Sequence, residues 1–383
     1  MKLAILMNSS SPWSREAALR LVECGHKVQV IDFSVVDKDT YIDSKDSFQA
    51  ADIREFIRSI VDIHRLKHHF SSQFRYLGAS WELSRILSRL DPDLLLVLYG
   101  GGYAAVAYLS DFRPYAVYAV GSDVLLGGKV KRTISRIALT AASAVMVNGK
   151  FLYQKTRQLA PRAKTHLLYL GTDTEKFAPG SPPPEAVRIV CTRGFSEIYN
   201  NEYLVRAIAE MPDLPRSFQM VFAGPGPLLE KVRAVADEVL TPERRRSVTF
   251  LGGVGREQMA ELLRDSHIYV SVSRSDGTSL SLMEGLACGL FPILSDIPAN
   301  REWISENAEN GLLVPLDEPK ALAAALVRAI CNPKLRTKAA HYNRQLILER
   351  ADDRKNMAIL ASHLEAIALG RKGGKAELVG TRS

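Results

Sequence analysis

The chain has 383 residues, of which 46% are hydrophobic and 24% are charged. This composition is typical of a globular protein with room for two domains, and it excludes disorder on a large scale. The N-terminal apolar run from Met1 to Asn8 is shorter than the apolar core of a signal peptide and far shorter than a membrane-spanning helix. We therefore expect a cytoplasmic protein.

The net charge of +8 indicates anionic partners, and nucleotide phosphates or lipid headgroups are favoured over nucleic acid. The basic stretch from Arg54 to Arg75 mixes cationic and apolar residues at helical spacing, and the short cluster Lys129–Arg132 adds to it. Such a stretch predicts either peripheral contact with an anionic membrane, here the inner face of the plasma membrane, or a solvated helix packed on a core.

The residues that commonly bind metals do not form a metal-binding pattern. Cys24, Cys191, Cys288 and Cys331 are widely scattered, which predicts reduced thiols rather than a disulfide framework or a zinc site. His64, His68 and His69 have helical spacing, but they lie on the basic stretch, where solvated histidines are expected. We predict no metal site.

Two series of apolar runs alternate with helical patterns, as in the βαβ units of a parallel sheet. The first series comprises expected strands at 2–7, 28–33 and 93–99, with helices at 17–24 and up to 90. The second comprises expected strands at 187–191, 219–223, 248–251 and 268–272, with helices at 203–211, 227–240 and 256–265. Two doubly wound α/β domains are therefore predicted, with Pro179 to Pro184 as a proline-rich linker between them.

One segment, from Arg274 to Gly289, predicts a site for a phosphorylated ligand. Gly277, Thr278 and Ser279 allow an anion to approach the backbone, and the helix that follows points its free N–H groups at that position. Asp276 lies in the loop before the helix, and Glu284 lies about two turns along it. An N-capped helix in which Glu284 forms an ordinary ion pair would have the same spacing.

The ordered motifs of the chain resemble those of the family 4 retaining glycosyltransferases, which have the GT-B fold. The central match is to the E-x7-E element of that family, written here as Asp276-x7-Glu284. Four further segments match in order, at 170–177, 222–226, 248–252 and 310–315. The resemblance implies two Rossmann-like domains with a cleft between them and a C-terminal helix that crosses back to the N-terminal domain.

By this resemblance, the domains are an acceptor-binding domain at 1–172 and a nucleotide-sugar-binding domain at 173–345. A crossing helix at 346–369 and a flexible tail at 370–383 follow. Residues 342–368 have a helical pattern with Met357, Leu360, Leu364 and Ile367 on one side.

The resemblance also assigns roles to individual residues. Glu284 would bind the ribose hydroxyls of a nucleotide sugar, Asp276 would hold hydroxyls of the donor sugar, and Arg193 would neutralise the diphosphate leaving group; these three form the expected catalytic set. The expected donor-binding residues are Arg193, Tyr199, Gly224, Asp276, Gly277, Thr278, Ser279, Leu280 and Glu284.

The chain departs from the family pattern at three positions. Tyr199 occupies the position of a family lysine that contacts the diphosphate, Val120 that of a histidine, and Asp276 that of a glutamate. Three explanations for the missing lysine stay open. Arg193, the helix terminus and the Tyr199 hydroxyl suffice; or another cation, Arg274 or Lys150, reaches the site; or activity is lost.

Residues expected on the acceptor side follow strands of the first domain. They are Ser10, Gly101, Gly102, Ser122 and Asp123. Each has an ordinary alternative, because glycines are needed in sharp turns after strands and Asp123 has a suitable position to cap a helix.

The function expected from the resemblance is transfer of a sugar, with retention of configuration, from a nucleotide-diphosphate sugar to a glycan or lipid-linked glycan acceptor. The donor would carry UDP or GDP and act as a co-substrate, with no cofactor. Bacterial cell-surface polysaccharide, lipopolysaccharide or glycolipid synthesis is the expected context, and a hexosyl- or N-acetylhexosaminyltransferase the expected type. The alternatives are a non-catalytic protein that binds a glycan or partner in the same cleft and, with less support, a sugar-nucleotide epimerase.

Overall fold

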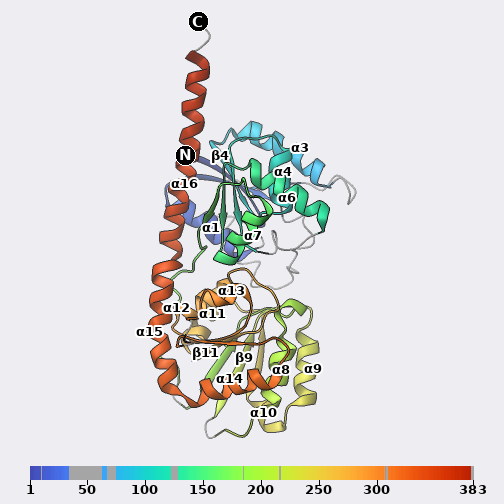
Figure 1. Ribbon diagram of the computed structural model, residues 1–383, viewed down its shortest axis with the longest axis vertical. Coiled ribbons are helices and arrows are strands. Elements are labelled where there is room, and N and C mark those ends of the chain that lie inside the picture. The colour runs from blue at the N-terminus through green and yellow to red at the C-terminus, as the bar shows by residue number, and fades with distance from the viewer. Residues whose placement is uncertain are drawn as a thin grey trace. The chain divides into compact units, whose positions relative to one another are not determined.

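The computed structural model describes residues 1–9, 11–33, 63–66, 75–121, 128–183, 185–214, 217–305, 307 and 309–380. The chain divides into two compact units, Met1–Leu170 with Arg354–Ser383, and Gly171–Asp353. Each unit has a parallel sheet with helices packed on it (Figure 1). The predicted doubly wound α/β architecture is confirmed.

The first unit contains seven described strands in the order β3-β2-β1-β4-β5-β6-β7. The strands are β1 Lys2–Met7, β2 Lys27–Asp32, β3 Ile63–Arg65, β4 Leu94–Leu98, β5 Tyr115–Ala119, β6 Ala144–Val147 and β7 Thr165–Leu167. The described helices of this unit that precede β7 in the chain are α1 Pro12–Glu23, α3 Arg75–Leu90, α4 Gly102–Leu109, α6 Lys129–Ala141 and α7 Lys150–Leu159.

The central strands of this sheet are buried on both faces, as their uninterrupted apolar sequences predict. All five residues of β4 and all five of β5 are buried. Such strands need helices on both sides, because neither face of the sheet is in contact with water. Helices α3, α4 and α6 lie side by side in the first unit (Figure 1).

The second unit contains six described strands in the order β10-β9-β8-β11-β12-β13. The strands are β8 Val187–Cys191, β9 Phe218–Ala223, β10 Val248–Gly252, β11 Ile268–Ser271, β12 Phe291–Ser295 and β13 Leu312–Val314. The helices are η2 Glu197–Tyr199, α8 Asn201–Ala209, α9 Leu229–Val239, α10 Pro242–Arg246, α11 Arg256–Arg264, α12 Leu280–Ala287, α13 Pro298–Arg301, α14 Pro319–Cys331 and α15 Pro333–Arg350.

The strand order of the second unit fixes where its site can form. The chain adds β9 and β10 on one side of β8, and it adds β11, β12 and β13 on the other side. The strand order therefore reverses between β8 and β11. Ligands of open parallel sheets bind beyond the carboxyl ends of the strands at such a point. The loops after β8 and β11 carry Arg193 and Asp276, respectively.

The prediction that a single crossing helix begins at residue 346 is wrong. Two helices occupy this part of the chain, α15, which ends at Arg350, and α16 Asp353–Gly380. Asp352 lies between them, accepts a hydrogen bond from Thr174 Oγ1 at 2.6 Å and pairs with Thr172 in a parallel bridge. These contacts take the backbone at 351–352 out of helical geometry, and α16 then returns the chain to the first unit from Arg354 onward.

The predicted linker also differs from the structure, because residues 179–183 belong to the second unit. A Cβ atom at Gly180 would collide with the backbone oxygen of Arg264, so this stretch packs closely on the end of α11. The chain passes between the units at Leu170 and Gly171 instead. Gly171 has φ +80°, and a Cβ there would lie 2.7 Å from the Ala351 oxygen.

The expected tail at 370–383 has helical structure as far as Gly380, because α16 continues through it. Glycine disfavours a helix by about 1 kcal/mol per residue relative to alanine. Helix α16 nevertheless extends through the glycines of this segment, as a continuation of its preceding turns. Across the described helices, none has an apolar stretch long enough to span a bilayer.

Candidate functional site

The site in the second unit is built around Arg193, two residues after the end of β8. The side chain is buried, with 9% of the residue exposed. A buried guanidinium carries five donors and a permanent charge, so it needs several partners to offset its lost hydration.

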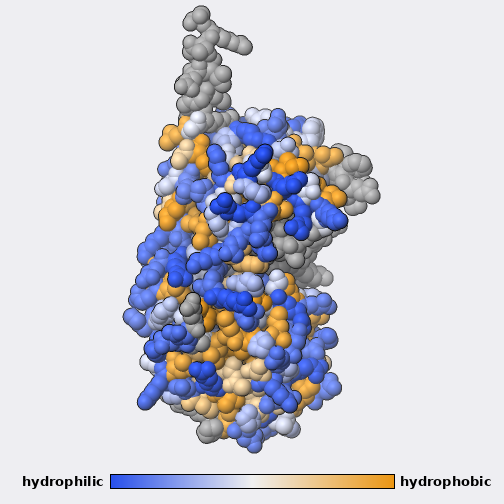
Figure 2. Space-filling model, in the orientation of Figure 1, coloured by the Kyte–Doolittle hydropathy of each residue, from blue (hydrophilic) through white to orange (hydrophobic). Residues whose placement is uncertain are grey.

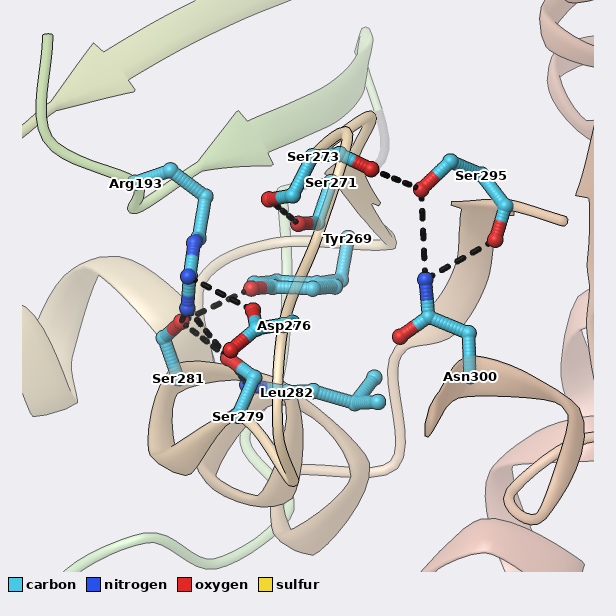
Figure 3. Close-up of polar contacts among 10 residues, drawn as sticks. All are labelled: Arg193, Tyr269, Ser271, Ser273, Asp276, Ser279, Ser281, Leu282, Ser295 and Asn300. Atoms are coloured by element: carbon cyan, nitrogen blue, oxygen red, sulfur yellow. Dashed lines mark hydrogen bonds and ion pairs between the residues drawn. The ribbon is translucent and has the colours of Figure 1, made fainter. Parts of the chain in front are cut away.

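Three side chains from the loop after β11 and the start of α12 supply partners for Arg193 (Figure 3). Its Nη2 donates to Asp276 Oδ2 at 2.6 Å, and its Nη1 donates to Ser281 Oγ at 3.0 Å and to Ser279 Oγ. Ser281 also contacts the Tyr269 hydroxyl at 2.9 Å. The guanidinium is thereby fixed at the N-terminus of α12.

The charges of Arg193 and Asp276 are strongly coupled. Burial alone would lower the pKa of Arg193, but the Asp276 carboxylate raises it above the ordinary value, so the guanidinium stays charged. Burial raises the pKa of Asp276, while Arg193 and the Gly277 N–H oppose that rise. The pair forms a compact polar site in a largely desolvated position.

The start of α12 adds a second source of positive potential. Ser279 is the N-cap residue, and its Oγ accepts from the Leu282 N–H at 3.3 Å. The first N–H groups of a helix have no acceptor within it, so those of Leu280 and Ser281 point out of the N-terminus. An anion beside Arg193 would meet the guanidinium and this helix end together.

The loop before α12 is held in place by residues of the neighbouring strand β12 and of helix α13, which follows it. Ser295 Oγ, at the end of β12, donates to the Ser273 carbonyl at 2.6 Å, and Asn300 Nδ2 donates to the Ser295 carbonyl at 2.9 Å (Figure 3). Thr278 Oγ1 donates to Glu302 Oε1 at 2.9 Å. These bonds fix the loop in which Asp276 and Gly277 lie.

Gly224, at the end of β9, contributes space rather than a polar side chain. A Cβ atom at this position would lie 2.7 Å from the Arg193 carbonyl oxygen and 3.1 Å from Gly194 Cα. The loops after β8 and β9 therefore approach each other closely only because residue 224 has no side chain.

Glu284 lies four residues after Leu280, so it is about one turn along α12 rather than the predicted two. Its carboxylate is buried and accepts from Arg256 Nη1 at 2.9 Å. Together with the Ser279 cap, this ion pair provides the ordinary alternative that the sequence left open. The Arg193 cluster is therefore the more specific indication of an anion site.

Tyr199, which replaces the family lysine, lies against Arg193. The Arg193 Cζ atom is 4.2 Å from the centroid of the Tyr199 ring. A guanidinium over an aromatic face is stabilised by the ring quadrupole, so the ring supports the orientation of Arg193 without adding a charge.

Arg274, one of the cations considered as a replacement, is bound elsewhere. Its guanidinium is bidentate to Asp317, at 2.8 and 2.7 Å, and also donates to Asn200 Oδ1 at 3.3 Å. Because Asp317 pairs with Arg274, we assign Arg274 a structural role, in which it joins the loops that follow η2, β11 and β13. Lys150 belongs to the other unit.

Of the acceptor-side residues, Ser10, Ser122 and Asp123 lie outside the described residues. Gly101 caps α4 and Gly102 begins it. A Cβ at Gly102 would lie 2.8 Å from the Tyr76 ring, so close packing on α3 explains this glycine.

Within the first unit, the start of α1 meets the segment after β4 that carries Gly101 and Gly102. Trp13 Nε1 donates to the Tyr99 hydroxyl at 3.1 Å, and their ring centroids are 5.0 Å apart. Tyr103 lies 5.0 Å from Tyr99. Tyr103 is buried, whereas Trp13 and Tyr99 are partly exposed.

Sequence reasoning missed Tyr269, Ser281 and Arg256. Single serines and tyrosines carry no spacing signal, and Arg256 opens a helix that the sequence had already predicted. Ser281 lies two residues after Ser279, but the sequence indicates only that both residues belong to a small, polar helix start.

Family models match both units. Residues 186–332 match the model described as glycosyl transferases group 1, and residues 18–149 match the model described as glycosyl transferase 4-like. EpsF of Bacillus subtilis is 30% identical over 43% of this chain and 42% of its own length. The D-rhamnosyltransferase WbpZ of Pseudomonas aeruginosa is 29% identical over 43% of this chain and 44% of its own. This chain thus spans less than half the length of these curated relatives.

Solved structures share the fold over nearly the whole chain. The Anabaena protein Alr3699/HepE, crystallised with UDP, has a TM-score of 0.76 at 15% identity and covers 96% of this chain and 100% of its own. A glycosyltransferase from Rickettsia africae has a TM-score of 0.75 at 14% identity, with 96% and 98% covered. At these identities the likeness shows the fold alone.

Proposed function

Because this chain belongs to the group 1 glycosyltransferases of the GT-B fold, we propose that it transfers one sugar from a nucleotide-diphosphate sugar to a glycan acceptor, with retention of configuration. The observation that carries the proposal is the buried Arg193 guanidinium, fixed by Asp276, Ser279 and Ser281 at the N-terminus of α12. That arrangement presents a permanent cation and free helix N–H groups to one diphosphate.

In the proposed reaction, the bond between the anomeric carbon and the diphosphate oxygen breaks, and a bond to the acceptor oxygen forms on the same face. The acceptor proton passes to the departing diphosphate. Arg193 neutralises the charge that develops on this leaving group, which is the largest electrostatic demand of the step. Asp276 holds donor-sugar hydroxyls and Glu284 holds ribose hydroxyls.

We propose that the donor is the co-substrate and that no cofactor or divalent metal takes part; in this proposal Arg193 and the N-terminus of α12 offset charge on the diphosphate. UDP is the first nucleotide to test, because the Anabaena neighbour was crystallised with it, and GDP is the second. Among the relatives, one is a GDP-mannose:cellobiosyl-diphosphopolyprenol alpha-mannosyltransferase of Xanthomonas oryzae. A lipid-linked glycan acceptor at the cytoplasmic face of a bacterial membrane, in polysaccharide or glycolipid synthesis, follows as the proposed context.

The decisive experiment measures thermal unfolding with UDP, GDP, ADP and their sugar conjugates, with EDTA present. A ligand at about one hundred times its Kd stabilises the folded state by roughly 2.7 kcal/mol. We expect one nucleotide to raise the midpoint of the wild type. Loss of a charge-assisted hydrogen bond costs about 1.5–3 kcal/mol, so Glu284→Ala should weaken that affinity by roughly 10- to 150-fold.

The matched control for Glu284→Ala is Arg256→Ala, which removes the same ion pair but leaves the carboxylate. If the ribose role is right, Arg256→Ala retains the wild-type nucleotide affinity and Glu284→Ala loses affinity by the factor given above. Equal losses in both variants would assign Glu284 to the structural ion pair alone. No midpoint shift with any nucleotide would refute the donor site.

A non-catalytic protein that binds a glycan or partner in the same cleft is the second candidate. It is favoured by Tyr199 in place of a cation and by the pairing of Arg193 with Asp276. Release of free nucleotide from the stabilising sugar conjugate, in the presence of extracted membrane glycolipids, separates the two candidates, because a binding protein turns over no donor.

A further inference from the structure

A cavity of about 410 Å³ lies in the first unit, at the amino ends of strands β5, β6 and β7. Pro114, Ser143 and Lys164 each line it from the position directly before one of these strands. Ala366 and Ile367 of α16 form another part of its wall. Cavities of about 300 to 1,000 Å³ hold small organic ligands, so this one has room for more than a single ion.

Arg113 brings to this cavity a positive charge that is oriented by neutral groups. Its Nη1 donates to the Phe112 carbonyl at 2.8 Å, and its Nη2 to the Tyr108 carbonyl at 3.5 Å. Its Cζ lies 4.9 Å from the centroid of the Tyr115 ring and 5.3 Å from that of Tyr108. Within the described part of the chain, Arg113 has no carboxylate partner. Carbonyl oxygens and aromatic faces fix a guanidinium without cancelling its charge, and further N–H donors remain available.

Ser143 and Lys164 supply two more donors to the same cavity. The Ser143 N–H donates to the Tyr115 carbonyl, whereas its hydroxyl has no partner among the residues that the structure describes. Lys164 is exposed, and over the same residues its ammonium group forms neither an ion pair nor a hydrogen bond. The described lining contains no Asp or Glu. Three donor groups, two of them cationic, therefore meet in one cavity without a carboxylate.

Exposed charge alone would not single out this position. Hydrophilic and hydrophobic side chains are intermingled over the face of the first unit seen in Figure 2. The basic stretch predicted to contact a membrane, Arg54 to Arg75, lies mostly outside the described residues, and the cluster Lys129–Arg132 begins α6. Neither is among the described residues that line the cavity. What distinguishes the cavity is that its donors converge on one concave space.

The remaining lining residues indicate that the ligand also has an apolar part. Pro114, Ala366 and Ile367 present carbon atoms to the same space as the three donors. An inorganic anion would leave these side chains in contact with water, whereas a ligand with an apolar body beside its anionic group would cover them.

We propose that this cavity binds an organic phosphate monoester, with its phosphate at Arg113, Ser143 and Lys164 and its organic part against the wall formed by α16. A phosphate monoester has three terminal oxygens for these three donors. Arginine binds two of the oxygens through its planar fork, and lysine adds a compact charge. A carboxylate offers two oxygens to the same three donors, so it should bind more weakly.

Such a ligand would join α16 to the sheet of the first unit. Lys164 precedes the edge strand β7, whereas Ala366 lies on α16. A molecule that contacts both stabilises their packing and should slow local opening of either element. The proposal does not rest on the donor chemistry, because every described lining residue belongs to the first unit and Arg193 to the second.

The test is titration calorimetry of the full chain with phenyl phosphate, followed by hydrogen exchange with and without this ligand. We expect one site per chain and slower exchange at 143–147 and 354–370. Phenyl phosphate should bind at least roughly tenfold tighter than inorganic phosphate, because burial of about 60 Å² of apolar surface corresponds to that factor. It should also bind tighter than benzoate, which keeps the ring but carries a carboxylate.

Two variants test the two parts of the cavity separately. Lys164→Gln removes one cation and should weaken binding about tenfold, the lower end for a charge-assisted hydrogen bond because Lys164 is exposed. Ala366→Trp fills the cavity without changing its charge and should abolish binding. The matched controls are Arg162→Gln, in the same loop as Lys164, and Ala358→Trp, on the same helix as Ala366. Both controls replace exposed residues outside the described lining and should retain the wild-type affinity.

Circular dichroism and the thermal midpoint without ligand establish that each variant is folded. The proposal is overturned if phenyl phosphate does not bind, if inorganic phosphate or benzoate binds equally tightly, or if folded Lys164→Gln and Ala366→Trp bind like the wild type. Equal losses in the controls would also overturn it, as would slower exchange confined to 193–199 and 276–287, which would place the ligand at the candidate donor site. Failure of the donor site would instead appear as a missing thermal shift with nucleotides while phenyl phosphate still binds.

Discussion

Tyr199 allows the open question of the missing family lysine to be tested directly. Its ring lies 4.2 Å from the Arg193 guanidinium, and Arg193 is the charged centre of the candidate donor site. Three substitutions separate the possible contributions: Tyr199→Phe removes the hydroxyl, Tyr199→Leu removes the aromatic face, and Tyr199→Lys restores the family cation.

The expected magnitudes follow from this contact. A cation–π contact at a partly buried site contributes about 1 kcal/mol, so Tyr199→Leu should lower the free energy of unfolding by that amount. In a unit of this size the midpoint would fall by roughly 2–4 °C. Tyr199→Phe keeps the ring face, and we expect a change within about 0.5 kcal/mol.

Tyr199→Lys adds a like charge beside Arg193. Two unit charges 4 Å apart repel by about 4 kcal/mol at an effective dielectric constant of 20. A flexible lysine relieves part of this by turning toward water, so a loss of about 2 kcal/mol without ligand is expected. A bound diphosphate neutralises both cations, so nucleotide should stabilise the lysine variant more than it stabilises the wild type.

The assay is urea unfolding of the four proteins with and without saturating UDP or GDP, followed by donor turnover. Without nucleotide, the expected order of stability is wild type and Tyr199→Phe, then Tyr199→Leu, then Tyr199→Lys. The increment from nucleotide should be largest for Tyr199→Lys and smallest for Tyr199→Leu. If Tyr199→Phe loses as much as Tyr199→Leu, the hydroxyl is responsible and the ring-face reasoning is wrong. Turnover by Tyr199→Lys alone would show that the natural tyrosine abolishes activity.

Two further predictions use ionisable groups of the second unit. Burial raises the pKa of Asp276 above the ordinary 3.8, against the opposing effects of Arg193 and the Gly277 N–H, so affinity for the sugar nucleotide should fall with decreasing pH through a pKa above that value. Titration calorimetry across pH checks this, and an unchanged pH profile in Asp276→Asn would contradict it. Burial also raises the pKa of Cys191 to about 11 and that of Cys288 to about 12, so a thiolate-selective reagent at pH 8 should label at most the exposed Cys24 and Cys331 in the folded protein and all four thiols in urea. Rapid labelling of Cys288 before unfolding would show that this part of α12 opens locally.

Much of the fold was predictable because the burial of parallel strands and amphipathic helices is reflected in the pattern of apolar residues within each element. β1 and β8 begin and end where their apolar runs do. The break between α15 and α16 was not predictable, because residues 342–368 keep a helical pattern through it. The contacts that stop the helix come from Thr172 and Thr174, far away in the chain.

The candidate site was predictable as a set of residues but not as a set of contacts. The sequence placed Arg193 and Asp276 each after a predicted strand, and the motif resemblance gave each a role. The direct pairing of Arg193 with Asp276, and the bond from Arg193 to Ser281, depend on side-chain directions across 83 and 88 residues, respectively. The Arg274–Asp317 pair joins residues 43 positions apart, and the sequence did not predict it either. Because of this pair, Arg274 is not the replacement for the missing lysine that the sequence had left possible.

The pairing of Arg193 with Asp276 has a consequence for ligand binding. A buried ion pair recovers only part of the hydration that its two charges lose, so a ligand that satisfies both charges separately can replace it at modest cost. A nucleotide sugar has this property: its diphosphate offers Arg193 a stronger anionic partner, and its sugar hydroxyls offer Asp276 hydrogen-bond donors. The same two residues can thus hold each other without donor and hold the two parts of the donor when it is bound. In the proposed donor complex we expect Ser279, Ser281 and Tyr199 to keep the guanidinium in position through this exchange of partners, because their contacts to Arg193 do not involve Asp276.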